Sequence, residues 1–297
     1  MEPRKFTYKE LSKMTNGFRE KLGEGSYAQV YKGVHGRVKI AVKIFFSDKV
    51  GSFDKELENL KKVNHQNIVE LVGYCDEDAQ YKVEQYNGQS VALPQTHRAL
   101  CFKFMPGCLG HKIADLAPRK LDLKWNECYK IIQGICYGIQ YIHQGRSEFM
   151  GHMDIKPNNI LLDENNDAKL ADFGLSRVFT NLDTRTTGSD YGTERYSPPE
   201  YKYGARRSAT FDIYSFGVVV LELVAGCEAY TRLRNKIDET HIFIDKAVKR
   251  WMEEYPHPFP KAHQKQLKTC IDIALDCIKL DTSQRPTINH IIQRLEK

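Results

Sequence analysis

The chain has 297 residues, of which 41% are hydrophobic and 28% are charged, and its formal net charge is +6. This length and composition are typical of a globular protein with one large domain or two lobes, and they argue against a disordered chain. The positive charge is modest and spread along the sequence, which favours an ordinary solvated surface over nucleic-acid or lipid binding. The eight cysteines form no CxxC pair, so we expect reduced packing residues in a cytosolic protein.

The sequence predicts neither a transmembrane helix nor an export signal. The longest strongly apolar stretch, residues 213–224, is interrupted by Ser215 and Glu222. It is shorter than the roughly 20 residues that span a bilayer, so we expect a buried helix. The first residues carry charge but no apolar run or small-residue cleavage site.

Short strand-like runs dominate the first hundred residues, at 29–31, 39–44, 68–74 and 100–104. They are rich in β-branched and aromatic residues. Between them, the spacing of the apolar residues in 52–64 predicts a helix. Residues 76–99 are polar and contain Gly88 and Pro94, so we expect an insertion loop there.

Helical spacing takes over after residue 106. Apolar residues recur every third or fourth position in 125–143, which predicts an amphipathic helix. Further helices are predicted at 209–226, at 267–278 and from Pro286 to the C-terminus. The pattern predicts an α+β fold with two lobes, a small one rich in β-sheet and a larger, mostly helical one.

Two features of the first lobe suit phosphate binding. Gly23 and Gly25 lie in a predicted hairpin whose backbone could approach a phosphate closely, although an ordinary turn has the same pattern. Lys43 lies within an apolar strand, and Glu56 falls on the apolar arc of the 52–64 helix. A buried carboxylate needs a cation, so Lys43 is its predicted partner; an edge-strand lysine facing solvent is the alternative.

The most informative segment is His152-Met153-Asp154-Ile155-Lys156-Pro157-Asn158-Asn159, followed later by Asp172-Phe173-Gly174. Phosphoryl transfer requires hard oxygen ligands for a metal, a group that positions a hydroxyl, and a cation. The segment resembles the catalytic loop and the metal-binding Asp-Phe-Gly of eukaryotic protein kinases. The resemblance implies that Asp154 is the catalytic base, that Lys156 neutralises the γ-phosphoryl group as in serine/threonine kinases, and that Asn159 and Asp172 bind Mg²⁺, with Mn²⁺ as an alternative. His152 is expected to orient the loop without reacting.

The same resemblance implies an ATP site in the first lobe. Lys43, paired with Glu56, would hold the phosphates under the glycine loop, in which Ala28 replaces the usual third glycine. Phe102 would form the rear of the adenine pocket and Met105 would offer backbone groups to the base. The apolar walls of the pocket would be Leu22, Val30, Ala41 and Leu161, each of which is equally a core residue.

Residues 192–200, Gly-Thr-Glu-Arg-Tyr-Ser-Pro-Pro-Glu, resemble the peptide-docking segment of protein kinases, with Pro198 in place of Ala. Glu200 is then expected to pair with Arg285, and Asp212 to brace the catalytic loop. The hydroxyl residues that could be phosphorylated before Glu200 are Ser176, Thr180, Thr184, Thr186, Thr187, Ser189, Tyr191 and Thr193. Met153 stands where most kinases have an arginine that receives a loop phosphate, so we expect little dependence on such phosphorylation.

Residues 6–11, 73–75, 212–226 and 285–287 resemble the plant receptor-like kinase group, and Met153 resembles its non-RD members, which lack the catalytic-loop arginine. This implies a juxtamembrane-like extension at 1–21, an N-lobe at 22–105 and a C-lobe at 106–297. The expected partners are protein substrates and an upstream receptor or co-receptor kinase, without nucleic acid. A cytoplasmic location is expected, at the plasma membrane only if the chain is part of a longer receptor.

Two alternatives remain open at this point. Ala28, Met153 and Pro198 depart from the kinase pattern, so a weakly active pseudokinase or signalling scaffold is one of them. A small-molecule kinase of related fold is the other. The 192–200 segment with its predicted Arg285 partner favours a protein substrate.

Overall fold

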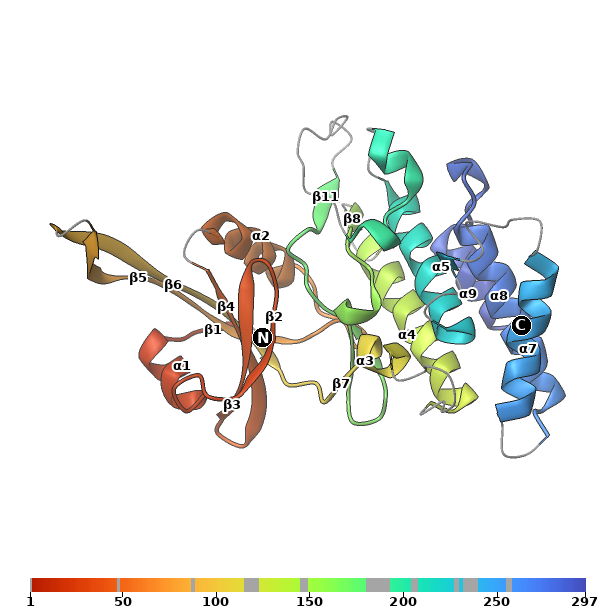
Figure 1. Ribbon diagram of the computed structural model, residues 1–297, viewed down its shortest axis with the longest axis horizontal. Helices are drawn as coiled ribbons and strands as arrows, with labels where there is room; N and C mark the ends of the chain where they lie inside the picture. Colours follow the sequence, from red (N-terminus) through yellow and green to blue (C-terminus); the bar gives the residue numbers. More distant parts are fainter. Residues whose placement is uncertain are drawn as a thin grey trace. The chain divides into compact units, whose positions relative to one another are not determined.

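A computed structural model describes residues 2–46, 49–86, 89–114, 123–144, 149–179, 193–203, 208–226, 230–231, 240–254 and 258–297. The chain divides into two compact units. The N-terminal unit comprises Met1–Asn64 and Val69–Met105, and the C-terminal unit comprises His65–Ile68 and Pro106–Lys297. The mixed α+β architecture predicted from the sequence is confirmed: the first unit is built on a sheet and the second is mostly helical (Figure 1).

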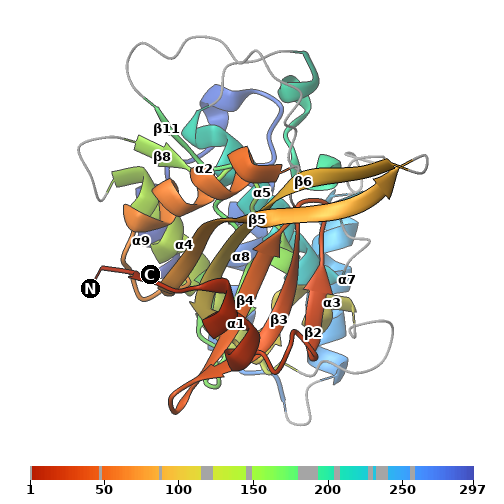
Figure 2. The same cartoon turned by 90° about the vertical axis from the view of Figure 1, so that its left-hand side faces the viewer.

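A six-stranded sheet in the order β1-β5-β6-β4-β3-β2 forms the N-terminal unit. All its neighbours pair antiparallel except β1 and β5. Its strands are β1 (Arg4–Lys5), β2 (Lys21–Glu24), β3 (Ala28–His35), β4 (Val38–Phe45), β5 (Leu71–Tyr86) and β6 (Gln89–Lys103). The helices described in this unit are α1 (Tyr8–Met14) and α2 (Val50–Lys61), which Figure 2 shows beside the strands.

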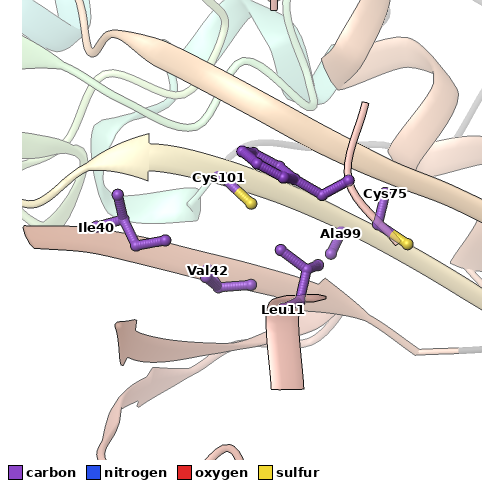
Figure 3. Close-up of a cluster of buried hydrophobic side chains, with 7 residues drawn as sticks. Leu11, Ile40, Val42, Cys75, Ala99 and Cys101 are labelled. Carbon is purple, nitrogen blue, oxygen red and sulfur yellow. The ribbon is translucent and has the colours of Figure 1, made fainter. Parts of the chain in front are cut away.

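The residues that precede β2 contribute directly to the core of this unit. Phe6 and Leu11 are buried together with Ile40 and Val42 of β4, and Cys75, Ala99 and Cys101 complete the cluster (Figure 3). A capping box starts α1: the backbone N–H of Glu10 donates to Thr7 Oγ1, and that of Thr7 donates to Glu10 Oε2. The apolar side of α1 therefore covers one face of the sheet.

The prediction of an insertion loop at 76–99 is wrong. β5 and β6 continue through this segment as an antiparallel ribbon, paired from Asp76↔Arg98 out to Tyr86↔Gln89. The pairing of β6 with β4 ends at Ala99, so the outer part of β6 has β5 as its neighbour within the described sheet. A proline is tolerated in such an edge strand, which is why Pro94 does not end β6.

The C-terminal unit is organised around α5 (Ala209–Ala225), which is buried from Phe211 to Val224. Helices α4 (Trp125–Gln144) and α8 (Lys261–Cys277) contact α5, and Figure 1 shows the three side by side. A Cβ at Gly217 would lie 2.6 Å from Cys277 Cβ, so α5 and α8 approach closely there. The other helices in the described part of this unit are α3 (Leu109–Ala114), α7 (Thr240–Glu254), α9 (Ile288–Leu295), and the short η2 (Pro157–Asn159), η3 (Glu194–Tyr196), η4 (Pro199–Tyr203) and η6 (Thr282–Gln284).

Two small sheets carry the loops of this unit. β10 (Ala168–Leu170) pairs with β9 (Ile160–Leu162), which pairs with β7 (Gly107–Cys108). β11 (Arg177–Phe179) pairs with β8 (Phe149–Gly151). Among the residues described for the whole chain, no helix has both the length and the apolar character needed to cross a membrane.

Replacing Gly73 by alanine should destabilise the N-terminal unit. The new Cβ would lie 2.3 Å from the carbonyl oxygen of Arg4 and 2.4 Å from Cε2 of Phe6, so β1 and the Phe6 ring must shift. We expect a loss of about 1–3 kcal/mol in the free energy of unfolding, measured by urea denaturation. Gly51→Ala, in α2, is the control, because a Cβ at this position would meet nothing within 4 Å. Equal midpoints for the two variants would contradict this packing.

Candidate functional site

Four predicted nucleotide-binding residues share one face of the N-terminal sheet. The core-facing residues of β4 are Ile40 and Val42, so the alternate residues Ala41 and Lys43 point to the opposite face. Cross-strand partners lie on the same face, and Val30 pairs with Lys43 while Phe102 pairs with Ala41. The face that α1 leaves uncovered therefore carries these side chains.

The glycine loop closes between β2 and β3. The backbone N–H of Gly25 donates to the carbonyl of Ala28 at 2.9 Å, and the β2–β3 register shifts between Lys21 and Gly23. A Cβ at Gly23 or Gly25 would meet nothing within 4 Å, so the backbone there is open to approach. Leu22 is exposed beside the loop, whereas Ala28 is buried.

The ion pair expected between Lys43 and Glu56 is present. Lys43 Nζ lies 2.7 Å from Glu56 Oε2, and the two side chains are 16% and 2% exposed. The carboxylate is brought there by α2, whose Phe53, Leu57 and Leu60 are buried on the same helix. A buried carboxylate at hydrogen-bond distance fixes the position of the ammonium group on the sheet.

Asp154 accepts hydrogen bonds from several groups of the C-terminal unit. Lys156 Nζ donates to Oδ2 at 2.7 Å, and Asn159 Nδ2 donates to the same oxygen at 2.8 Å. The backbone N–H and the hydroxyl of Thr193 both lie 3.2 Å from Oδ1, and Lys156 Nζ is 2.9 Å from that hydroxyl. The carboxylate predicted to be the base thus faces a hydroxyl and a lysine, which is the environment needed to orient an acceptor alcohol.

His152 has the orienting role expected of it. The backbone N–H of Asp154 donates to its Nδ1 at 3.3 Å, so Nε2 carries the proton and donates to the carbonyl of Ala171 at 3.1 Å. Its ring packs against buried Phe173 with a centroid distance of 4.8 Å. The ring connects the catalytic loop to the Asp-Phe-Gly segment.

Asp212 holds the catalytic loop from α5, as predicted. Its fully buried carboxylate accepts from His143 Nε2 at 2.9 Å and from the backbone N–H groups of His152 and Met153 at 2.8 and 2.9 Å. Burial alone would raise the pKa of Asp212, but the hydrogen bond and charge of His143, with the smaller effects of His152 and the Met153 N–H, hold it below its usual value. The residue held in this way, Met153, has φ of 66°, in the left-handed region.

The two predicted metal ligands lie at the same end of the β9–β10 hairpin. Asn159 directly precedes β9. The backbone N–H of Ala171 donates to the carbonyl of Asn159 at 2.9 Å, and Asp172 is the residue that follows Ala171 in the chain. Both N–H groups of the Asn159 amide point to Asp154, so its Oδ1 is the atom suited to a cation. Asp172 has φ of 67°, a strained conformation typical of functional sites.

These two side chains fit a divalent ion that is shared with a substrate. No group of three or more His, Cys, Asp or Glu residues suited to a metal occurs in the described parts of the chain. Mg²⁺ is usually bound by one or two side-chain oxygens together with phosphates and water, so a dedicated protein cage is not required. The amide oxygen and the carboxylate are both hard ligands of this kind.

Met153 lies in a small apolar cluster of the C-terminal unit. It is buried with Tyr201 and Phe211, and Leu175 and Phe179 pack against them. The backbone of this region is fixed by the β8–β11 pair, in which Phe179 lies opposite Phe149. The position at which the kinase resemblance would place an arginine is therefore filled by hydrophobic packing.

Among the described residues, two ion pairs hold the segment that was predicted to dock a peptide, and the sequence predicted one of them. Arg285 Nη1 and Nη2 donate to the two carboxylate oxygens of Glu200 at 2.6 and 2.9 Å, as expected. The second pair, between Arg195 Nε and Glu222 Oε1 at 2.6 Å, was not predicted. Arg195 and Glu222 are 27 residues apart in the sequence. The sequence signal for such a pair was the charge of Glu222 within an apolar helical run, which requires a partner but does not identify it.

The structure describes two of the hydroxyl residues that were predicted as phosphorylation candidates before Glu200, namely Ser176 and Thr193. Ser176 is buried and its hydroxyl donates to the carbonyl of His152 at 3.0 Å, so it is not part of a solvated loop. Thr193 contacts Asp154 and Lys156, a role that the sequence did not reveal. The candidates that lie outside the described residues are Thr180, Thr184, Thr186, Thr187, Ser189 and Tyr191.

The predicted site residues fall into two groups, one in each unit. The N-terminal unit contains Leu22, Gly23, Gly25, Val30, Ala41, Lys43, Glu56, Phe102 and Met105. The C-terminal unit contains Asp154, Lys156, Asn159, Leu161 and Asp172. Leu161 is the middle residue of β9 and pairs with Lys169 of β10 and Cys108 of β7.

Asp212→Asn should cost roughly 2–4 kcal/mol in the free energy of unfolding, because an amide nitrogen would face groups that donate to the carboxylate. The lowered pKa means that this stabilisation is complete above the unfolded value of about 4 and is lost as the pH falls through the folded value. The gap between wild type and variant in urea denaturation should therefore be full at pH 7 and shrink below about pH 4.

Asp276→Asn is the matched control for this prediction. Asp276 also has a lowered pKa, because the hydrogen bonds and charges of Lys279 and Arg294 outweigh the effect of burial, but its ion pairs are partly exposed. We expect a loss below about 1 kcal/mol. Equal losses for the two variants would contradict the special role of Asp212.

Comparison with known proteins agrees with this geometry. Residues 17–295 match the family model described as protein kinase domain. Cysteine-rich receptor-like protein kinase 19 of Arabidopsis thaliana is 34% identical over 98% of the chain, which spans 44% of that protein. A probable LRR receptor-like serine/threonine-protein kinase of the same plant is 32% identical over the whole chain, which spans 32% of that protein. The chain thus covers less than half the length of these relatives, and it belongs to the protein kinase family, with receptor-like kinases of plants among its homologues.

Proposed function

We propose that the chain is an active serine/threonine protein kinase that transfers the γ-phosphoryl group of ATP to a hydroxyl group of a protein substrate. The observation that carries this proposal is the environment of Asp154, whose carboxylate contacts both Lys156 and the hydroxyl of Thr193. A carboxylate held in this way can orient an alcohol and accept its proton. The adjacent ammonium group of Lys156 neutralises negative charge on the transferred group.

The nucleotide and metal are assigned to the residues that suit them chemically. Asn159 and Asp172 would hold Mg²⁺, with Mn²⁺ as the alternative, through an amide oxygen and a carboxylate. When bound, the ion neutralises charge on the phosphate oxygens. Lys43, whose ammonium group is held by Glu56, would bind the phosphates of the nucleotide. The backbone at Gly23 and Gly25, which no neighbouring atom blocks, would approach the same phosphates.

The adenine is assigned to apolar residues. On the N-terminal unit these are Leu22, Val30, Ala41 and Phe102, with backbone groups of Met105, and Leu161 is the residue assigned on the C-terminal unit. We propose that residues 1–21 are an extension of the kinase, that 22–105 bind the nucleotide, and that 106–297 carry the transfer chemistry and the protein substrate.

We further propose that the kinase belongs to the non-RD members of the receptor-like group. Met153 supports this, because its side chain is packed in an apolar cluster and cannot bind a phosphate. The relatives are described as receptor-like kinases and are longer than this chain. The proposed setting is the cytoplasmic side of a receptor system, with an upstream receptor kinase as a partner.

Asp154→Asn should lower the rate of phosphate transfer from radiolabelled ATP to a protein substrate by roughly 10²–10⁴-fold, because an amide cannot accept the proton of the alcohol. Asp272→Asn is the control, since this exposed aspartate lies on α8 away from the catalytic loop. Incorporation at background level in both wild type and Asp154→Asn would favour the scaffold alternative, to which Ala28, Met153 and Pro198 point.

Phosphorylation of the segment between Asp172 and Glu200 should change the rate of phosphate transfer to an added substrate by less than about tenfold. A tenfold change corresponds to about 1.4 kcal/mol, which is the contribution of roughly one contact to the phosphate. The chain is incubated with MgATP, its phosphosites are mapped by mass spectrometry, and each modified residue is replaced by alanine. Met153→Leu, which retains apolar packing, should behave like wild type. A larger gain on phosphorylation of one residue, abolished by its alanine variant, would show that loop phosphorylation activates this kinase.

A further inference from the structure

The net positive charge of the chain is concentrated in residues 1–45. This segment holds ten of the 44 Lys and Arg residues but four of the 38 Asp and Glu residues, which gives it a net charge of +6, equal to that of the whole chain. The remaining residues hold equal numbers of the two signs. The expectation of a positive charge spread along the sequence is therefore wrong.

Most acidic groups of this segment are already neutralised. Three of the four are in ion pairs, which are Arg4–Glu10, Lys21–Glu24 and Lys32–Glu20. A further cation, Lys43, is paired with Glu56 of α2. The exposed cations of the segment that have no ion-pair partner within the described residues are Lys5, Lys9, Lys13, Arg19, Arg37 and Lys39. Glu2 is the one acidic residue of the segment that is left to balance them.

The cations of α1 point away from the sheet. Lys9 and Lys13 are four residues apart on this helix and therefore lie on the same side of it. Each is about 160° around the helix axis from Leu11, which is buried against the sheet. Their ammonium groups are thus presented to solvent over the outer surface of the N-terminal unit.

The chain after α1 brings this surface to β3. A Cβ at Gly33 would lie 2.9 Å from the carbonyl oxygen of Met14, so the end of the helix meets the strand. The backbone N–H of Lys32 donates to the carbonyl of Glu20 at 2.8 Å, which holds Arg19 beside the same part of β3. The residues that follow in β3 lead directly into the turn before β4.

This turn carries further cations and two exposed aliphatic residues. Arg37 lies in the turn, and Lys39 pairs with Val34. Val34 is 51% exposed and Val38 is 49% exposed. Figures 1 and 2 both show the turn at the same end of the sheet as α1. We refer to this surface as the basic end, and its residues are Lys9, Lys13, Arg19, Val34, Arg37, Val38 and Lys39.

The combination of unpaired cations and exposed valines favours one kind of partner. Acidic headgroups of a bilayer attract Lys and Arg side chains, and aliphatic side chains can enter the boundary between headgroups and acyl chains. A surface for single-stranded nucleic acid usually adds aromatic side chains that stack on bases. Both exposed large hydrophobic residues of the basic end are aliphatic, so its chemistry fits a lipid surface better than a nucleic acid.

We propose that the basic end is a membrane-binding surface that docks the N-terminal unit on a bilayer containing acidic phospholipids. The five cations lie against the headgroups, and Val34 and Val38 insert at the edge of the acyl chains. This inference goes beyond the proposed kinase function and does not depend on phosphate transfer. If the basic end is only a solvated surface, the protein has no preference for acidic over neutral bilayers.

The test measures binding of the full chain to vesicles by cosedimentation. One set of vesicles is phosphatidylcholine alone, and the other contains about 30% phosphatidylserine. At about 0.1 M salt, binding to the acidic vesicles should be at least about tenfold tighter, and the difference should shrink at about 0.5 M salt because the charges are screened. Equal binding to the two sets, or no binding to the acidic set, would overturn the inference.

The variant Lys9→Gln with Lys13→Gln should weaken binding to the acidic vesicles by roughly 10–25-fold. Lys261→Gln with Lys265→Gln is the matched control, because these exposed lysines of α8 have the same spacing and the change in charge is the same. The control should bind like wild type. Equal weakening in the two variants would show that total charge and not the basic end governs binding. Midpoints of urea denaturation should be the same for both variants, since all four side chains are exposed.

The variant Val34→Thr with Val38→Thr tests the aliphatic contribution. Threonine keeps the β-branched shape that suits a strand but adds a hydroxyl, so binding to the acidic vesicles should weaken by roughly three- to tenfold. Binding to a fluorescent oligonucleotide at the same salt is measured in parallel. Unchanged vesicle binding by this variant, or tighter binding of wild type to the oligonucleotide than to the acidic vesicles, would contradict the inference. Neither measurement needs turnover, so both outcomes are independent of the proposed kinase activity.

Discussion

The arrangement of the catalytic loop depends on one buried carboxylate, that of Asp212. Two consecutive backbone N–H groups, those of His152 and Met153, can point at one acceptor only if the chain turns sharply between them, and Met153 accordingly has positive φ. This conformation costs a non-glycine residue about 1–2 kcal/mol, whereas a hydrogen bond to a charged group contributes about 1.5–3 kcal/mol. The two bonds outweigh the strain, and Asp154 follows in a fixed position.

Ion pairs with a buried member recur wherever one segment must be fixed to another within a unit. Lys43–Glu56 joins β4 to α2, Arg285–Glu200 joins η4 to the turn before α9, and Arg195–Glu222 joins η3 to α5. Such pairs add little net stability compared with hydrophobic contacts, because desolvation offsets most of the attraction. Their effect here is positional, since losing the partner of the buried member would leave a buried charge and disfavour any other arrangement.

The features that the sequence predicted are those encoded by local pattern or by a motif of fixed spacing. Glu56 could be placed because its position on the apolar arc of a helix requires a cation, and Glu200 and Asp212 because they belong to motifs. The 76–99 ribbon was missed because Gly88 and Pro94 indicate a loop, although an edge strand tolerates proline. The positive φ of Met153 and Asp172 could not be read from residue type, because tertiary hydrogen bonds and packing impose it.

Polar and apolar contacts together hold the chain at Met153. Asp212 binds the backbone of Met153, while the side chain of Met153 packs with Tyr201, Phe211 and Phe179. Phe179 belongs to β11, whose backbone pairs with β8, so the chain after the Asp-Phe-Gly segment is held by a strand pair and by this cluster. An arginine at 153 would bring a charge into this cluster and require an anion to balance it. Methionine removes that requirement, because the hydrophobic burial of its side chain needs no anion.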